Sequence, residues 1–153
     1  MGSTLSIWED LMEDTSFGLF AIHSPLEDYA LAYELNRVCG LLLQRMPEDL
    51  SDRDASIFPV FQWQDEAHFR TWTLFVNVGS AETQAADSGL FGGEATRRRS
   101  FLIPEKREVD FFLKVEGGEP EAGVLPIVLA IPKVITAYRL EAAKLKSKHN
   151  LIF

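Results

Sequence analysis

The chain has 153 residues, of which 46% are hydrophobic and 25% charged, and its formal net charge at pH 7 is -8. This length and composition are typical of one globular domain with a hydrophobic core. The acidic balance argues against a general nucleic-acid binder, which needs a basic face, and against adhesion to an anionic membrane. We therefore expect neither nucleic acid nor a membrane as a partner.

Cysteine content and the absence of targeting signals bear on the compartment. Cys39 is the only cysteine, so no internal disulfide can form, and its position beside Leu35 and Val38 indicates a buried, inert thiol. The N-terminus is acidic and lacks the basic start and apolar core of a signal peptide. The longest apolar run, Val124–Ile131, contains Pro126 and is too short to span a bilayer. These features predict a cytoplasmic protein.

Two patterns compete in the N-terminal segment Met1–Asp14. Leu5 and Ile7 alternate as in an edge strand, whereas Ile7 and Leu11 have helical spacing. We predict a short strand that leads into an acidic turn.

The stretch Phe17–Met46 has the pattern of a βαβ unit. Phe17–His23 is an apolar run of strand length. Ser24–Glu27 matches the capping box S-x-x-E, with proline at the first helical position. We predict a helix that ends at Cys39, where Gly40 provides a left-handed stop, and an extended apolar run from there to Met46.

Two side-chain stripes run along this predicted helix. Leu31, Leu35 and Val38 form an apolar stripe that should face the sheet. Tyr29 and Tyr33 lie on a neighbouring stripe and are predicted at its margin, where a ring can pack while its hydroxyl meets water.

A β-hairpin is predicted from Ile57–Trp63 and Phe69–Val78, which alternate in polarity and are joined by a polar turn. Pro59 has no N–H to donate, so it suggests an edge position or a bulge. The preceding acidic segment, Pro47–Ala55, is predicted to be a loop with a helical turn as an option at Glu48–Leu50.

Gly79–Arg98 is small, polar and glycine-rich, which predicts a mobile loop. The run Arg97–Arg99 fits a phosphate site. We favour the alternative of a solvated loop end that balances nearby acids.

A second βαβ unit is predicted from Glu108 to Leu140. Ser100–Ile103 precedes it as a short strand that Pro104 stops. The unit itself consists of a strand at Glu108–Val115, a helix within Pro120–Ile131 and a strand at Val134–Leu140. Pro126 must sit in the first turn of the helix or kink it.

Two βαβ units separated by a hairpin predict an α+β fold. We expect a mainly antiparallel sheet covered on one face by two helices, related to split βαβ, ferredoxin-like domains. Similarity at the level of the fold does not imply a function.

The sequence at Ile103–Phe111, IPEKREVDF, resembles the signature of the bacterial IPExxxVDY family, with phenylalanine in place of the final tyrosine. His23–Asn36 and Leu145–Phe153 also resemble segments of that family. The resemblance covers most of the chain outside Gly79–Arg98 and implies a single, full-length bacterial domain. Because the function of the family is unknown, it implies no activity.

No familiar catalytic motif occurs, and the three histidines lack the spacing of metal ligands. We therefore expect no catalytic residue, metal or cofactor. His23 lies in the best local cluster, beside Ser24, Glu27 and Asp28, but a structural role is favoured because Ser24 is needed as a cap. Glu105 and Asp110 would be about 15 Å apart in a strand. That separation is too large for a glycosidase pair and favours capping or salt-bridge roles.

The C-terminal tail allows two interpretations. Lys146, Ser147 and Lys148, followed by Asn150, could form an anion site. We favour a segment that delivers the terminal apolar triplet Leu151–Phe153 into a hydrophobic groove, because an exposed apolar end would be a liability.

Three functions fit these features, in order of preference. The first is a non-enzymatic protein-interaction or regulatory module, whose partner is another protein or a second copy of this chain. The second is a domain for a small molecule or anion, with a pocket near the His23 strand end and the tail. The third is an enzyme with an unrecognised site. The candidate binding residues are His23, Tyr29, Tyr33, Glu105, Lys146 and Lys148.

Overall fold

The computed structural model describes residues 17–51, 56–83, 96–117 and 123–151. The prediction for Met1–Asp14 lies outside these residues. In chain order the helices and strands are β1 (Gly18–His23), α2 (Asp28–Cys39), β2 (Gln44–Arg45), β3 (Leu50–Ser51), β4 (Ile57–Phe58), β5 (Val60–Asp65), β6 (Arg70–Val76), β7 (Val78–Thr83), β8 (Thr96–Phe101), β9 (Phe111–Glu116), α3 (Val124–Leu129) and β10 (Thr136–Leu140). Short 3₁₀ turns occupy Pro104–Lys106, Ala142–Lys144 and Lys148–Leu151.

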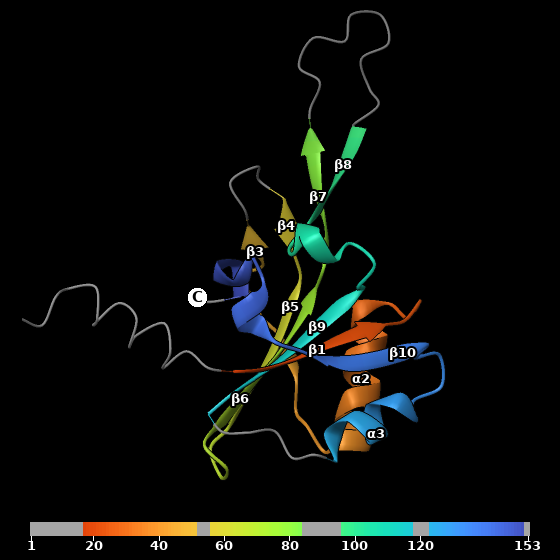
Figure 1. The fold of residues 1–153 in the computed structure, drawn as a ribbon, viewed down its shortest axis with the longest axis vertical. Helices are drawn as coiled ribbons and strands as arrows, with labels where there is room; N and C mark the ends of the chain where they lie inside the picture. Colours follow the sequence, from red (N-terminus) through yellow and green to blue (C-terminus); the bar gives the residue numbers. More distant parts are fainter. Residues whose placement is uncertain (1–16, 52–55, 84–95, 118–122, 152–153) are drawn as a thin grey trace, which may run out of the picture.

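The main sheet has six strands in the order β10-β1-β9-β6-β5-β2, and every neighbouring pair is antiparallel. Both helices lie on one face of this sheet (Figure 1). β9 and β10 run parallel on either side of β1 and are joined by α3, which is a split βαβ unit. β1 and β2 are also parallel and are joined through α2. The predicted α+β fold is therefore confirmed.

A second sheet, β3-β4-β7-β8, is absent from the sequence prediction. It arises because the predicted hairpin belongs to both sheets. Pro59 separates β4 from β5, since it cannot donate to the ladder, and Asn77 separates β6 from β7. The hairpin itself is confirmed, with Trp63 opposite Trp72 and Asp65 opposite Arg70.

The prediction of a loop across Gly79–Arg98 is wrong at both ends. β7 and β8 pair there over six residues each, from Val78 opposite Phe101 to Thr83 opposite Thr96. Small and polar side chains do not prevent this pairing, because backbone groups make the ladder and β7 directly continues the buried strand β6. Residues 84–95 lie outside the described chain.

Helix α2 begins at Asp28, so the predicted capping box is wrong. Its N-cap is Glu27, which makes no side-chain capping bond. Ser24 lies three residues further upstream. Its hydroxyl accepts the N–H of Leu26 at 3.2 Å and donates to the carbonyl of Lys133 at 2.7 Å. The predicted stop is confirmed, because Gly40 has the left-handed backbone angle φ = 67°.

Strand and helix boundaries in the second βαβ unit also differ from the prediction. β9 begins at Phe111 rather than Glu108, and β10 begins at Thr136 rather than Val134. Val134 lies outside β10 because its N–H donates back to the carbonyl of Ile131 at 3.1 Å, which makes it part of the turn after α3. Pro126 sits in the first turn of α3, as predicted.

The other differences concern short segments. Of the run Leu41–Met46, only Gln44–Arg45 forms a strand, at the edge of the main sheet. Glu48–Leu50 is not a helical turn, because Leu50 begins β3. The strand predicted at Ser100–Ile103 is instead the end of β8, which stops at Phe101.

Both faces of the main sheet are buried, each by different segments of the chain. On the helix face, the sheet packs against Leu31 and Leu35 of α2 and Val128 of α3. On the opposite face, the loop after β8 and the C-terminal tail cover Leu19 and Phe112, which are fully buried. No helix in the described ranges is long and apolar enough to cross a membrane.

Candidate functional site

The signature segment Ile103–Asp110 is held by Asn77, a fully buried side chain at the junction of the two sheets. Its Nδ2 donates to the carbonyls of Lys106 and Val109, both at 2.8 Å. Its Oδ1 accepts the N–H of Ile103 at 2.9 Å. One amide therefore satisfies backbone groups at both ends of the segment, which sequence reasoning missed because Asn77 lies 26 residues before Ile103.

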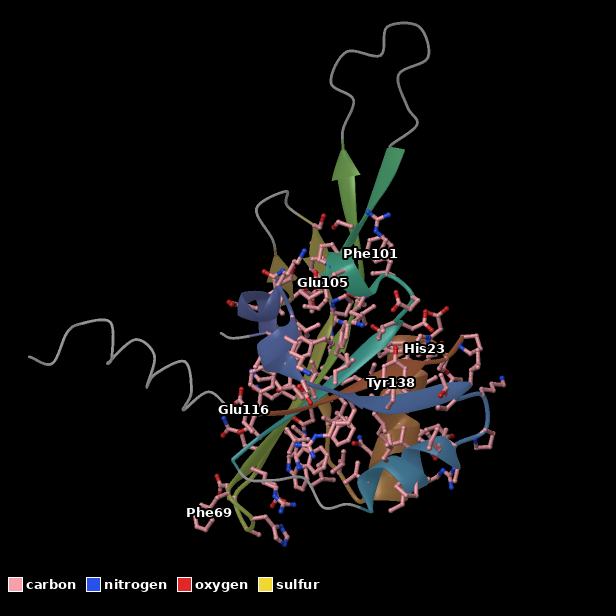
Figure 2. The ribbon with its side chains drawn as sticks, viewed as in Figure 1. His23, Phe69, Phe101, Glu105, Glu116 and Tyr138 are labelled. Atoms are coloured by element: carbon pink, nitrogen blue, oxygen red, sulfur yellow. The ribbon has the colours of Figure 1, made fainter. Side chains whose placement is uncertain are left out.

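Glu105 joins this segment to the C-terminal tail (Figure 2). Its carboxylate accepts the backbone N–H of Ser147 at 2.8 Å and the hydroxyl of Ser147 at 2.9 Å. Partial burial acts to raise the pKa of Glu105, but these bonds and the backbone N–H of Lys146 outweigh it and hold the pKa below its usual value. Glu105 thus has a capping role, as predicted for a carboxylate at this position.

Asp110 also caps a backbone group. Its Oδ2 accepts the N–H of Ser24 at 2.8 Å, and its own N–H donates to Ile22 at 3.2 Å. The two carboxylates of the signature therefore act separately, Glu105 on the tail and Asp110 on the turn after β1.

His23 is engaged with Tyr138 of β10, as Figure 2 shows. The Nε2 atom of His23 and the hydroxyl of Tyr138 are 3.0 Å apart, and the ring centroids are 5.5 Å apart. The pKa of the Tyr138 hydroxyl is raised, mainly by partial burial and to a smaller extent by the nearby negative charge of Glu108. These contacts give His23 the structural role that we favoured.

The tail folds back onto the sheet, in agreement with the interpretation we favoured. Leu151 is fully buried, and the amide of Asn150 donates to the carbonyl of Leu102 at 2.7 Å. The ammonium group of Lys114, a buried residue of β9, donates to the carbonyl of Leu151 and pairs with Glu116. Two donors of the alternative anion site, Ser147 and Asn150, are therefore used within the protein.

The remaining candidate residues do not converge on one site. The side chain of Lys146 is exposed, and that of Lys148 lies outside the described structure, as do Ile152 and Phe153. Tyr29 and Tyr33 are 67% and 64% exposed, so most of the surface of each residue is open to solvent.

An open cleft of about 580 Å³ lies beside the start of α2. We call it the α2 cleft. Its apolar lining comes from four separate segments and includes Leu26, Ile57, Pro59, Val76, Val78 and Phe111. Among the described residues, its other lining side chains include four carboxylates, those of Glu27, Asp28, Asp49 and Asp110, and no basic group.

The first lining residue of the α2 cleft, Ser24, directly follows His23 in the chain. Among the described residues, neither His23 nor any residue of the tail lines the cleft. The cavity therefore lies near the predicted pocket, but it is lined by Ser24–Asp28 and not by His23 or Lys146. Ile57, which is 48% exposed, and Asp49 come from segments that no local pattern connects to Ser24–Asp28. Only the tertiary fold brings them together.

A smaller cavity of about 260 Å³ lies where the β5–β6 hairpin meets the end of α2 and the start of α3. Trp63, Trp72 and Cys39 contribute to its lining. Burial raises the pKa of the Cys39 thiol, which keeps it protonated, as expected for an inert cysteine.

Comparisons with protein-family models, curated proteins and solved structures found no match. Within the described residues, no three His, Cys, Asp or Glu side chains are grouped so that they could hold a metal ion. The geometry of the α2 cleft is therefore the main guide to function.

Proposed function

We propose that this protein is a non-enzymatic interaction module that binds a short basic and apolar segment of a partner protein in the α2 cleft. The observation that carries the proposal is the combination of an exposed apolar lining with four carboxylates, two of which form no ion pair with a described residue. Ile57 leaves 48% of its surface open to solvent there, so a partner side chain can cover it.

The charge balance of the α2 cleft favours a basic occupant. Arg45 pairs with two of its four carboxylates, at 3.6 Å to Asp28 and 2.5 Å to Asp49. Glu27 and Asp110 form no ion pair with any described residue. The start of α2 contributes roughly half a positive charge. Four carboxylates against one guanidinium and this partial charge leave the cleft negative, which attracts Arg or Lys.

Chemistry on a substrate is less well supported than binding. Among the described residues, Ser24 supplies the only hydroxyl in the lining, and it is buried and donates to the carbonyl of Lys133 at 2.7 Å. No histidine, cysteine or lysine of the described chain lines the α2 cleft to act as a base for Ser24. The lining therefore supports recognition rather than catalysis.

Two further expectations form part of this proposal. We also propose that the chain is a member of the IPExxxVDY family, on the basis of the match between Ile103–Phe111 and the family signature. A cytoplasmic location is supported by the single cysteine, which suits a reducing compartment.

Selection from a displayed library of random peptides tests the proposal. We expect selected peptides to alternate apolar residues with Arg or Lys, and their affinity to fall as salt is raised, since the attraction is partly electrostatic. Ile57→Lys should weaken peptide binding by about tenfold or more. The new ammonium group repels the basic residues of the peptide, and the apolar contact of Ile57 is lost.

Leu42→Lys is the matched control for this experiment. Leu42 is 62% exposed but does not line the α2 cleft, so the same substitution there should leave peptide affinity unchanged. Equal effects of the two variants, or selected peptides without basic residues, would contradict the proposal.

A further inference from the structure

Among the sheet edges in the described chain, the outer edge of β10 is the best suited to pair with another strand. β2 and β3, at two of the other edges, are only two residues long. β8, at the fourth, has six residues but carries the consecutive arginines Arg97–Arg99. Charged edge strands resist pairing with a further strand. β10 has five residues and a single charge, Arg139.

Apolar side chains are exposed where the chain leads into this edge. Ile135, directly before β10, is 75% exposed, and Leu129, the last residue of α3, is 44% exposed. Val124 and Val128 of α3 face the core, and Ile127 lines the cavity shared with the end of α2. Leu129 follows Ile127 by two residues, or about 200° around the helix, so it lies on the flank turned away from α2.

We propose that β10 is the edge through which two copies of this chain form a dimer. The copies would pair antiparallel about a twofold axis at Tyr138, so that the six-stranded sheet continues into its copy. Thr136 then stands opposite Leu140 of the partner subunit, and Ala137 stands opposite Arg139 of the partner subunit. No like charges face each other, which removes the main electrostatic obstacle to self-pairing.

Repulsion between like charges excludes β8 as the self-pairing edge. Antiparallel pairing of two β8 strands about Arg98 places Arg97 of each copy opposite Arg99 of the other. Like charges directly opposite one another destabilise a strand pair. Strand length excludes β2 and β3 and charge pattern excludes β8, which leaves β10 as the self-pairing edge.

The pairing extends one step beyond the strand and gives a sharp test. Glu141, which follows β10, keeps an extended backbone with φ = -90° and ψ = 102°. In the proposed register, Ile135 stands opposite Glu141 of the partner subunit. Ile135→Glu would place two carboxylates opposite each other twice per dimer, whereas Ile135→Lys would place an ammonium group opposite each carboxylate. Both variants remove the same exposed apolar side chain.

Sedimentation equilibrium of the full-length wild type and the two variants measures the dimer dissociation constant. We expect a wild-type dimer, about tenfold or more weaker association for Ile135→Glu, and a smaller loss for Ile135→Lys. Far-UV circular dichroism checks that both variants fold, as expected for a side chain so exposed. A wild type that stays monomeric up to about 1 mM would overturn the proposal. A dimer with a dissociation constant above that concentration has a free energy of association weaker than ~4 kcal/mol. Equal dissociation constants for the two variants would also overturn it.

Discussion

Asn77 gives the most quantitative prediction of the fold. Replacing it with alanine leaves two buried backbone groups, the N–H of Ile103 and the carbonyl of Val109, without their partner. Each unsatisfied buried group costs about 1–3 kcal/mol, so Asn77→Ala should lower the free energy of unfolding by roughly 2–6 kcal/mol. The carbonyl of Lys106 is only part-buried and can turn to water. Against a typical total of about 5–15 kcal/mol, this loss is large.

Urea unfolding measures this loss of free energy. The slope of the free energy of unfolding against urea concentration should be the same in wild type and variant if both unfold in the same transition. Hydrogen exchange at the amide of Ile103 should quicken in Asn77→Ala more than exchange in β1. Asn36→Ala is the matched control, because the Asn36 amide also forms two hydrogen bonds with the backbone, both part-buried. It accepts the N–H of Leu43 at 2.8 Å and donates to the carbonyl of Leu43 at 3.1 Å. Asn36→Ala should lose only about 0.5–2 kcal/mol. A loss in Asn77→Ala no larger than in this control would refute the reasoning.

Three further predictions concern the tail and one turn. Leu151→Ala should lower the free energy of unfolding by about 2–5 kcal/mol in urea titration, because Leu151 is fully buried, and an unchanged midpoint would mean that the tail is not docked. The lowered pKa of Glu105 adds stability that is present above its unfolded value of about 4.3 and is lost as pH falls through the folded pKa. Glu105→Gln should therefore show a smaller fall in melting temperature than wild type between about pH 5 and pH 2, and an identical fall would argue against the Glu105–Ser147 contact. Gly117→Ala should destabilise by more than about 1 kcal/mol, since φ is 91° and a Cβ would lie 2.1 Å from the carbonyl oxygen of Phe69, and thermal melting of this variant and of Gly123→Ala, which has free space, measures the difference.

The parts of the fold that follow local rules could be predicted from the sequence. The alternation in Ile57–Trp63 and Phe69–Val78 predicts the β5–β6 hairpin, which is confirmed. Gly40 ends α2 because the left-handed conformation there suits glycine. Leu151 is buried, as expected for an apolar residue of the tail that needs cover.

The parts that failed depend on contacts between distant segments. Ser24 matches a capping box locally, but the carbonyl of Lys133, 109 residues later, accepts a hydrogen bond from its hydroxyl. The six-residue strand β8 is likewise stabilised by its pairing with β7 rather than by its own composition. The α2 cleft has no signature in the sequence for the same reason, because the fold brings Ile57 and Asp49 to the turn after β1. Phe69 shows that an apolar residue in a predicted strand need not be buried. It lies at the tip of the β5–β6 hairpin and is 85% exposed (Figure 2).

The most direct test of the proposed function is a ¹H–¹⁵N NMR titration of the protein with two short peptides, one alternating leucine with arginine and the other leucine with glutamate. We predict that the arginine peptide shifts the backbone amides of Leu26, Ile57 and Val78, which line the α2 cleft from three separate segments, and that the shifts saturate. The glutamate peptide, matched in length and apolar content, should leave these amides unmoved because the cleft is negative. Equal shifts with both peptides, or shifts concentrated outside the α2 cleft, would contradict its role as a site for basic and apolar segments.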